Sequence, residues 1–272
     1  MPKEPFDPQQ AAVIHQAREN DPSKQAWLQA LGAYKYLVKR ARSRHNPDSL
    51  SERSLAERIL SGQPLSFAAF YGVGGKINVD RYDYALLEEL RQITQSAAAV
   101  ISYAPSTQTT LLLADIHGEF NGFIDPQSGK SSDDSYDYLN QVANLAKEMG
   151  MQPLWLSQLY QQYGLTLPDL SQPIPEESRA RRLVEGHRAR GDHRAEQLIE
   201  SARRHHQSGL DPYHIAKHYV AMRLQEAPML EDLLPASILL VHGSKDLSQA
   251  VLPRNVPALF LDTRPAWFLN ER

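Results

Sequence analysis

The sequence contains no cysteine. Disulfide bonds, thiolate metal ligands and cysteine nucleophiles are therefore excluded. Long apolar runs are missing too: no segment approaches the ~20 apolar residues of a membrane helix, and the amino terminus has no apolar signal core. From these absences we expect a soluble, cytoplasmic protein that makes no membrane contact.

An excess of positive charge is also missing. The 272 residues include 29 Lys and Arg against 32 Asp and Glu, which gives a formal net charge of -3. Such a balance creates no overall attraction to nucleic acid, so we expect small-molecule rather than nucleic-acid partners. The hydrophobic content of 42% can supply the core of one large domain, and we expect a single α/β domain over residues 1–272.

A short apolar run at residues 111–114 ends abruptly in ionisable side chains. Asp115 and His117 follow it, with Gly118 and Gly122 as turn residues. A strand that delivers ionisable groups at its carboxyl end is typical of sites in open α/β sheets. The alternative is that Asp115 caps the next turn and His117 is an ordinary surface histidine.

Two further strands are predicted to end in chemically useful residues. Residues 238–241 form a buried-strand pattern that ends in His242, the counterpart of His117. Residues 65–71 read as a strand that leads into a glycine-rich loop with Lys76. That loop lacks the spacing of a nucleotide P-loop, but Lys76 could still bind an anion.

The order of elements indicates the fold class. Strand, ionisable turn and helix follow one another, with helices expected at residues 80–99, 136–149 and 154–163. We therefore predict an open, mainly parallel, Rossmann-like α/β sheet flanked by helices. Residues 1–62 should form a helical N-terminal region. Residues 165–210 should form a linker and a polar helical insert or lid.

The segment 176–226 is rich in histidine and arginine. His214 and His218 have the four-residue spacing of metal ligands, but residue 215 is Ile, so the His-Glu-x-x-His pattern is absent. Acidic residues in this segment offset the positive charge of the arginines, so the segment is a weak candidate for nucleic-acid binding. We favour a solvated helical cover in the first half. In the second half, a docked helix could present Arg223 inward.

A series of residues follows a recognisable order along the chain: Phe67, Phe70, Lys76, Asp80, Ala85, Leu86, Leu90, the Tyr-Ala-Pro at 103–105, Asp115, Phe120, Tyr136 or Tyr138, Arg223, and the strand ending in His242. In this order and spacing, the chain resembles the pyoverdine/dityrosine biosynthesis family, which includes isocyanide synthases. The resemblance covers roughly residues 65–149 and, more weakly, 219–267. One departure is Ala-Asp-Ile-His-Gly at 114–118, where the family usually has Ser-Asp-Gly. Another is Pro-Ala-Trp at 265–267, where the family has Pro-Trp-His.

The resemblance implies a biosynthetic enzyme that joins the amino group of an amino acid, aromatic in the characterised cases, to a carbon of a pentulose phosphate such as ribulose 5-phosphate. It implies acid/base catalysis without a metal or other cofactor. In such a site His117 and His242 would transfer protons. Asp115 would orient a histidine or bind the substrate amine. Lys76 and Arg223 would bind phosphate or carboxylate. Further substrate-binding candidates are Phe70, Tyr71, Glu119 and Asn121.

Two other functions remain open from the sequence. The first is a metal-dependent hydrolase or oxygenase that uses Asp115, His117 and a further histidine. The second is a non-catalytic module that binds protein or RNA through the helix at residues 176–206.

Overall fold

The computed structural model describes residues 66–72, 78–100, 108–120, 132–205, 209–234, 237–242, 247, 250–253, 256 and 258–261. The helical region predicted for residues 1–62, and the side chains of Lys76 and Asn121, lie outside these residues. For His242 only the backbone is described. Within the described part, no helix combines the length and apolarity that crossing a bilayer requires.

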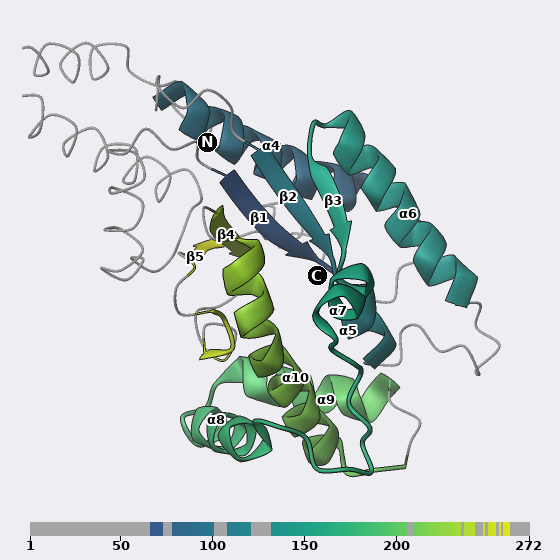
Figure 1. Cartoon of the computed structure of the whole chain (residues 1–272), viewed down its shortest axis with the longest axis vertical. Coiled ribbons are helices and arrows are strands. Elements are labelled where there is room, and N and C mark those ends of the chain that lie inside the picture. The colour runs from purple at the N-terminus through teal and green to yellow at the C-terminus, as the bar shows by residue number, and fades with distance from the viewer. Residues whose placement is uncertain are drawn as a thin grey trace, which may run out of the picture.

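The described strands form one open sheet of five strands in the order β3-β2-β1-β4-β5 (Figure 1). They are β1 (Ser66–Tyr71), β2 (Gln108–Leu113), β3 (Gln152–Trp155), β4 (Ser237–His242) and β5 (Ala258–Leu261). All four pairings are parallel. Strands buried on both faces of such a sheet read as nearly continuous apolar runs, as in the Leu-Leu-Leu of β2. The predicted open, parallel α/β fold is confirmed.

Alternate residues of each strand bury opposite faces of the sheet. One face carries Phe67 and Tyr71 of β1 and packs against α4 (Arg81–Val100) and α6 (Ser132–Glu148). The other face carries Ala68 and Phe70 and packs against α7 (Leu156–Tyr163) and α10 (Pro212–Leu233). Helices therefore cover both faces, as parallel sheets require.

Two local predictions were wrong in detail. The segment expected to be helical at 154–163 begins as strand β3, and α7 starts only at Leu156. The aromatic residues of segment 154–163 have helical spacing, but the pairing of β3 with β2 holds residues 154 and 155 in a strand. The residues after β2 were expected to form a turn. They form the short helix α5 (Asp115–Phe120), which includes Gly118.

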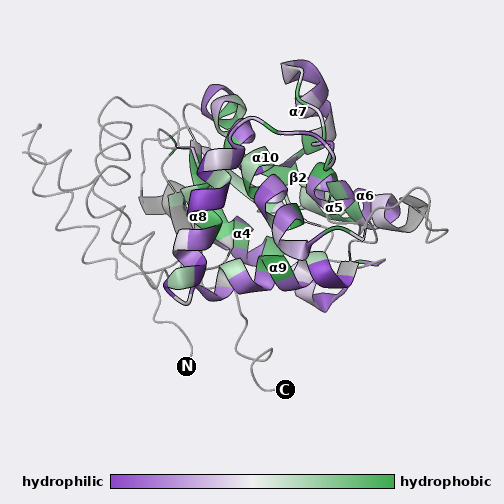
Figure 2. Ribbon diagram, turned by 90° about the horizontal axis from the view of Figure 1, so that it is seen from below, coloured by the Kyte–Doolittle hydropathy of each residue, from purple (hydrophilic) through white to green (hydrophobic). Residues whose placement is uncertain are grey.

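The polar segment after α7 contains α8 (Glu177–Ala189) and α9 (His193–His205). Figure 1 shows both beyond the carboxyl ends of β1 to β3. Figure 2 shows them as largely hydrophilic, with interspersed hydrophobic residues. Those residues dock on the first half of α10, which makes this segment a packed part of the described structure. The buried residues of the contact include Ala180, Val184, Ala195, Ile199, Ala216 and Val220.

The strand order places a topological switch at β1. The chain proceeds from β1 to β2 on one side and later returns to β4 on the other side. In open α/β sheets, ligands bind outside the carboxyl ends of the strands at such a point. In this protein those ends are Tyr71 of β1, Leu113 of β2 and His242 of β4.

Candidate functional site

A buried polar cluster lies beside the carboxyl end of β2. The strand ends at Leu113, and α5 begins two residues later with Asp115. Asp115 and His117 are both buried, with 1% and 7% of their surfaces exposed. The prediction that β2 delivers these two groups into the protein is therefore met, and an ordinary surface histidine at position 117 is excluded.

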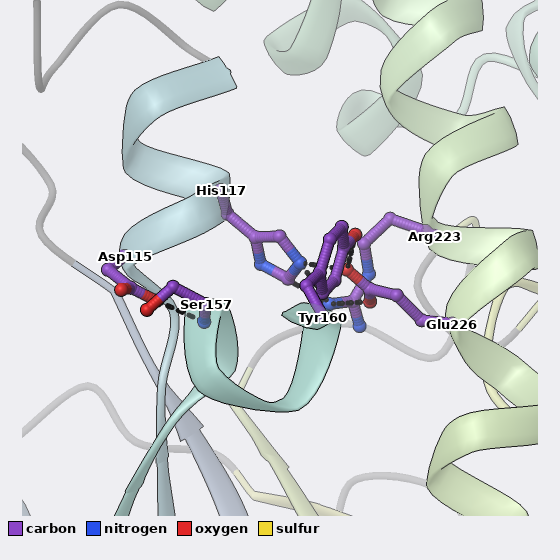
Figure 3. A network of polar contacts seen from close by, with 6 residues as sticks. All are labelled: Asp115, His117, Ser157, Tyr160, Arg223 and Glu226. Atoms are coloured by element: carbon purple, nitrogen blue, oxygen red, sulfur yellow. Dashed lines mark hydrogen bonds and ion pairs between the residues drawn. The ribbon is translucent and has the colours of Figure 1, made fainter. Parts of the chain in front are cut away.

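The side chains of Asp115 and His117 contact different parts of the structure. They are two residues apart on a helix, and side chains at that spacing do not face each other. In Figure 3 the Asp115 carboxylate lies beside Ser157, whereas the His117 ring points toward α10. The Ser157 backbone N–H donates to Asp115 Oδ1 at 3.0 Å. Asp115 therefore does not orient the His117 ring.

Glu226 of α10 takes that orienting role. His117 Nε2 lies 2.6 Å from Glu226 Oε1, and the Tyr160 hydroxyl donates to the same oxygen at 2.6 Å. Arg223 Nη1 lies 2.8 Å from Glu226 Oε2, as an ion pair without hydrogen-bond alignment. Glu226 is 0% exposed, so its charge is neutralised by protein groups alone.

These contacts define the protonation pattern of His117. With Glu226 ionised, Nε2 must carry the hydrogen that it donates to Oε1. Nδ1 then has a lone pair, and Arg223 Nη1 lies within donating reach of it at 3.3 Å. Arg223 Nη1 is also 2.9 Å from Nε2, but two donors cannot bond to each other, so that approach is only a contact. In the neutral Nε2–H tautomer, His117 can donate to Glu226 through Nε2 and accept from Arg223 through Nδ1.

The electrostatics agree with a neutral histidine beside an ionised carboxylate. Burial lowers the pKa of His117, and the attraction of Glu226 only partly opposes this effect. Burial disfavours ionisation of Glu226, but Arg223 and His117 outweigh it and hold the pKa of Glu226 below its usual range. Burial and the neighbouring Glu226 raise the pKa of Tyr160, so its hydroxyl remains a donor.

Aromatic rings hold the cluster in place. The Arg223 guanidinium carbon lies 4.3 Å from the centre of the Phe70 ring, within the range of a cation–π contact. Tyr219 meets His117 edge-on, with ring centres 5.7 Å apart. Because Tyr219, Arg223 and Glu226 are three or four residues apart, one face of α10 presents all three.

The structure brings three of the predicted site residues together: His117, Arg223 and Phe70. Tyr71 lies on the opposite face of the sheet, where its hydroxyl donates to Asp83. Glu119 lies one turn beyond Asp115 on α5. Strand β4 ends at His242 as predicted. Lys76, Asn121 and the His242 side chain lie outside the described residues, so their roles stay predictions.

Sequence reasoning missed Glu226 and Tyr160. One signal was available for Glu226: it follows Arg223 by three residues in a helix that is otherwise apolar on that face. An acidic residue in such a place needs a cation. Tyr160 gave no separate signal, because its spacing on α7 is also that of a core residue.

The side chains of His214 and His218 contact backbone carbonyl oxygens. Their rings lie 4.2 Å apart, and His214 Nε2 lies 2.9 Å from the carbonyl oxygen of Leu170. Both ring nitrogens of His218 lie near backbone carbonyl oxygens. Among the described residues, no group of three or more His, Asp or Glu side chains is arranged to hold a metal ion.

Comparison with known proteins shows similarity in structure only. No protein-family model and no curated protein sequence matches the chain. Among solved structures, the crystal structure of the PvcA protein from Pseudomonas aeruginosa matches with a TM-score of 0.52. The match covers 86% of this chain and 84% of that chain at 13% identity. The chain has the PvcA fold. This likeness confirms the predicted resemblance at the level of the fold.

Proposed function

We propose that this chain is a biosynthetic enzyme of the isocyanide-synthase type, acting on the amino group of an amino acid with a pentulose phosphate as co-substrate. PvcA, whose fold it has, is a pyoverdine chromophore/isocyanide synthase family protein. The observation that supports the proposal most directly is the His117–Glu226–Arg223 cluster, which lies at the strand ends where such folds bind ligands.

His117 is suited to act as a general base. A neutral imidazole whose Nε2–H is anchored by a carboxylate has its basic lone pair on Nδ1. Arg223 Nη1 lies 3.3 Å from this nitrogen, so Nδ1 must exchange that contact for the substrate before it takes a proton. Glu226 stabilises the imidazolium that forms when Nδ1 takes a proton, since the two groups are 2.6 Å apart. Removal of protons from the substrate amine, as carbon–nitrogen bonds form, is the step that needs this base.

Arg223 is suited to bind an anion. Its described polar contacts all use Nη1, which directs the remaining N–H groups of the planar guanidinium elsewhere. A phosphate or carboxylate can accept two such N–H groups side by side. Phe70 supports the guanidinium from one face, so the head group keeps its orientation.

The test is product formation. We expect purified protein, incubated with L-tyrosine or L-tryptophan and uniformly carbon-13-labelled ribulose 5-phosphate, to form an isocyanide. Relative to the amino acid, that product has one labelled carbon more and two hydrogens fewer, which mass spectrometry detects. Reactions without the sugar phosphate, or with heat-denatured protein, serve as controls. If both substrates survive prolonged incubation with folded protein, the proposal is wrong.

A further inference from the structure

One oxygen of Asp115 is left without a partner. Asp115 is 1% exposed, and its Oδ1 accepts the Ser157 N–H at 3.0 Å. Its Oδ2 is buried and has no hydrogen-bond partner among the described residues. Leaving a buried charged acceptor unpaired costs on the order of 1–3 kcal/mol or more, so such an atom calls for a ligand or a catalytic role.

A second carboxylate shares this environment. Glu119 lies four residues after Asp115 and therefore on the same side of α5. Burial and the nearby Asp115 carboxylate raise the pKa of Glu119. Like charges at this spacing repel each other, and no described cation pairs with either one. Among the described residues, these two carboxylates therefore form a negative region without a paired cation.

Aromatic side chains complete the surroundings. Burial is the main cause that raises the pKa of the Tyr136 hydroxyl, and Asp115 and Glu119 add to it, so both carboxylates lie within electrostatic range of this group. The Tyr136 ring packs near Trp155, with ring centres 6.2 Å apart. Trp155 precedes α7, the helix whose Ser157 N–H anchors Asp115. Aromatic faces and carboxylates both attract alkylammonium groups.

We propose that Asp115, Glu119 and Tyr136 form an amine subsite that binds a protonated primary amine, with Asp115 Oδ2 as its main acceptor. This inference rests on the proposed function, in which the bound amine is the amino group of the substrate. An ammonium group has three donors and no acceptor. It can therefore satisfy Asp115 Oδ2, Glu119 and the oxygen of Tyr136 together.

The contrast with Glu226 explains why the ligand is a cation. Glu226 is equally buried, but Arg223 of the chain itself supplies its positive charge. At Asp115 no described residue supplies a positive charge within ion-pair distance, so a cationic ligand would supply it. A neutral group would leave both carboxylates uncompensated. Asp115 and His117 both belong to α5, so an amine held at Asp115 would lie beside the same short helix as the proposed base.

The experiment measures binding by titration calorimetry on the full chain, without any sugar phosphate. Tyramine is the probe, and 3-(4-hydroxyphenyl)propionate, which lacks the amine, is the comparison ligand. We expect tyramine to bind and the comparison ligand to bind at least tenfold more weakly. Asp115→Asn keeps the Ser157 contact but loses the charge, so it should weaken tyramine binding about 10- to 100-fold.

Glu119→Gln is the second variant, because Glu119 is only half-buried and its replacement should leave folding intact. We expect it to weaken tyramine binding several-fold. Glu148→Gln, an exposed acid at the end of α6, is the matched control and should bind as the wild type does. The inference is overturned if the amine-free ligand binds as well as tyramine, or if folded Asp115→Asn and Glu119→Gln both bind tyramine normally.

These outcomes are separable from the failure of the proposed function. Amine binding that depends on Asp115, without any isocyanide product, would retain the subsite and reject the reaction. Isocyanide formation together with unchanged amine binding in both variants would retain the reaction and reject the subsite.

Discussion

Two buried carboxylates lie on opposite faces of the sheet and are satisfied in different ways. Asp83 of α4 accepts hydrogen bonds from the hydroxyls of Tyr71 and Tyr138 and from the backbone N–H of Asp80. Glu226 of α10 contacts the imidazole of His117, the guanidinium of Arg223 and the hydroxyl of Tyr160. Both carboxylates are almost fully buried.

The difference shows that burial of an acid does not by itself make a site. The described partners of Asp83 are two phenols, whose pKa values are raised, and an amide, and none of these changes its charge near neutral pH. The Glu226 cluster contains a histidine, which can exchange a proton, and an arginine, which can bind an anion. The Asp83 cluster ties α4 and α6 to the sheet, whereas the Glu226 cluster contains the residue types to which our proposal assigns proton transfer and anion binding.

The largest expected effect is on the reaction. His117→Gln should lower the rate of isocyanide formation about 10²- to 10⁴-fold, because a general base typically contributes this much. The measurement is initial rate with saturating substrates. His193→Gln removes an exposed histidine on α9 and should leave the rate unchanged. Wild-type rates in folded His117→Gln would mean that the two clusters do not differ in function.

The next largest effect is on stability. Glu226→Ala leaves Arg223 and His117 buried without their carboxylate, and breaking such a buried pair costs roughly 3–5 kcal/mol. Urea unfolding should show this loss. Glu226→Gln retains the shape and an acceptor oxygen, so it should lose less stability. An alanine variant as stable as the wild type would show that water reaches and solvates these charges.

A smaller loss is expected on the other face. Asp83→Asn cannot accept all three of its present hydrogen bonds, since one oxygen becomes a donor group. The free energy of unfolding should fall by about 1–3 kcal/mol. The rate of product formation per folded molecule should not change. A large loss of rate with normal folding would place Asp83 in the reaction and remove the contrast.

The smallest effect concerns pH. Burial lowers the pKa of His117, so below about pH 6.5 the unfolded chain takes up a proton that the folded chain resists. This contribution to stability is present above pH 6.5 and is lost as the pH falls. The slope is at most about 1.4 kcal/mol per pH unit.

Urea unfolding of the wild type and His117→Gln over roughly pH 5.5 to 7 measures this slope. In this range Glu226, whose pKa is lowered from 4.5, stays ionised. The variant should have a flatter pH dependence than the wild type. Equal slopes in the two proteins would mean that His117 titrates alike in the folded and unfolded states.

Much of the fold could be predicted because its signals are local. The apolar runs of β2 and β4 and the amphipathic stripe of α6 follow from hydrophobic burial at fixed periods. β3 could not be recognised in this way, because its four residues at the edge of the sheet are too few to show a period that separates a strand from a helix. The start of α5 at Asp115 was missed because Gly118 and Gly122 indicated a turn.

For the candidate site, the residues alone determine which groups are available. They include Asp115 and His117 after an apolar strand and Arg223 on a helix, and they exclude any cysteine. Tertiary structure decides the pairings. Glu226 is 109 positions from His117 in the chain, and only the docking of α10 on the sheet brings them to 2.6 Å.

Asp115 and His117 are neighbours in sequence, but they have different partners. Helix geometry turns their side chains to different sides, and long-range packing then supplies a partner for one and leaves an oxygen of the other unpaired. Such pairings depend on distance and burial in three dimensions, and neither is encoded by local spacing.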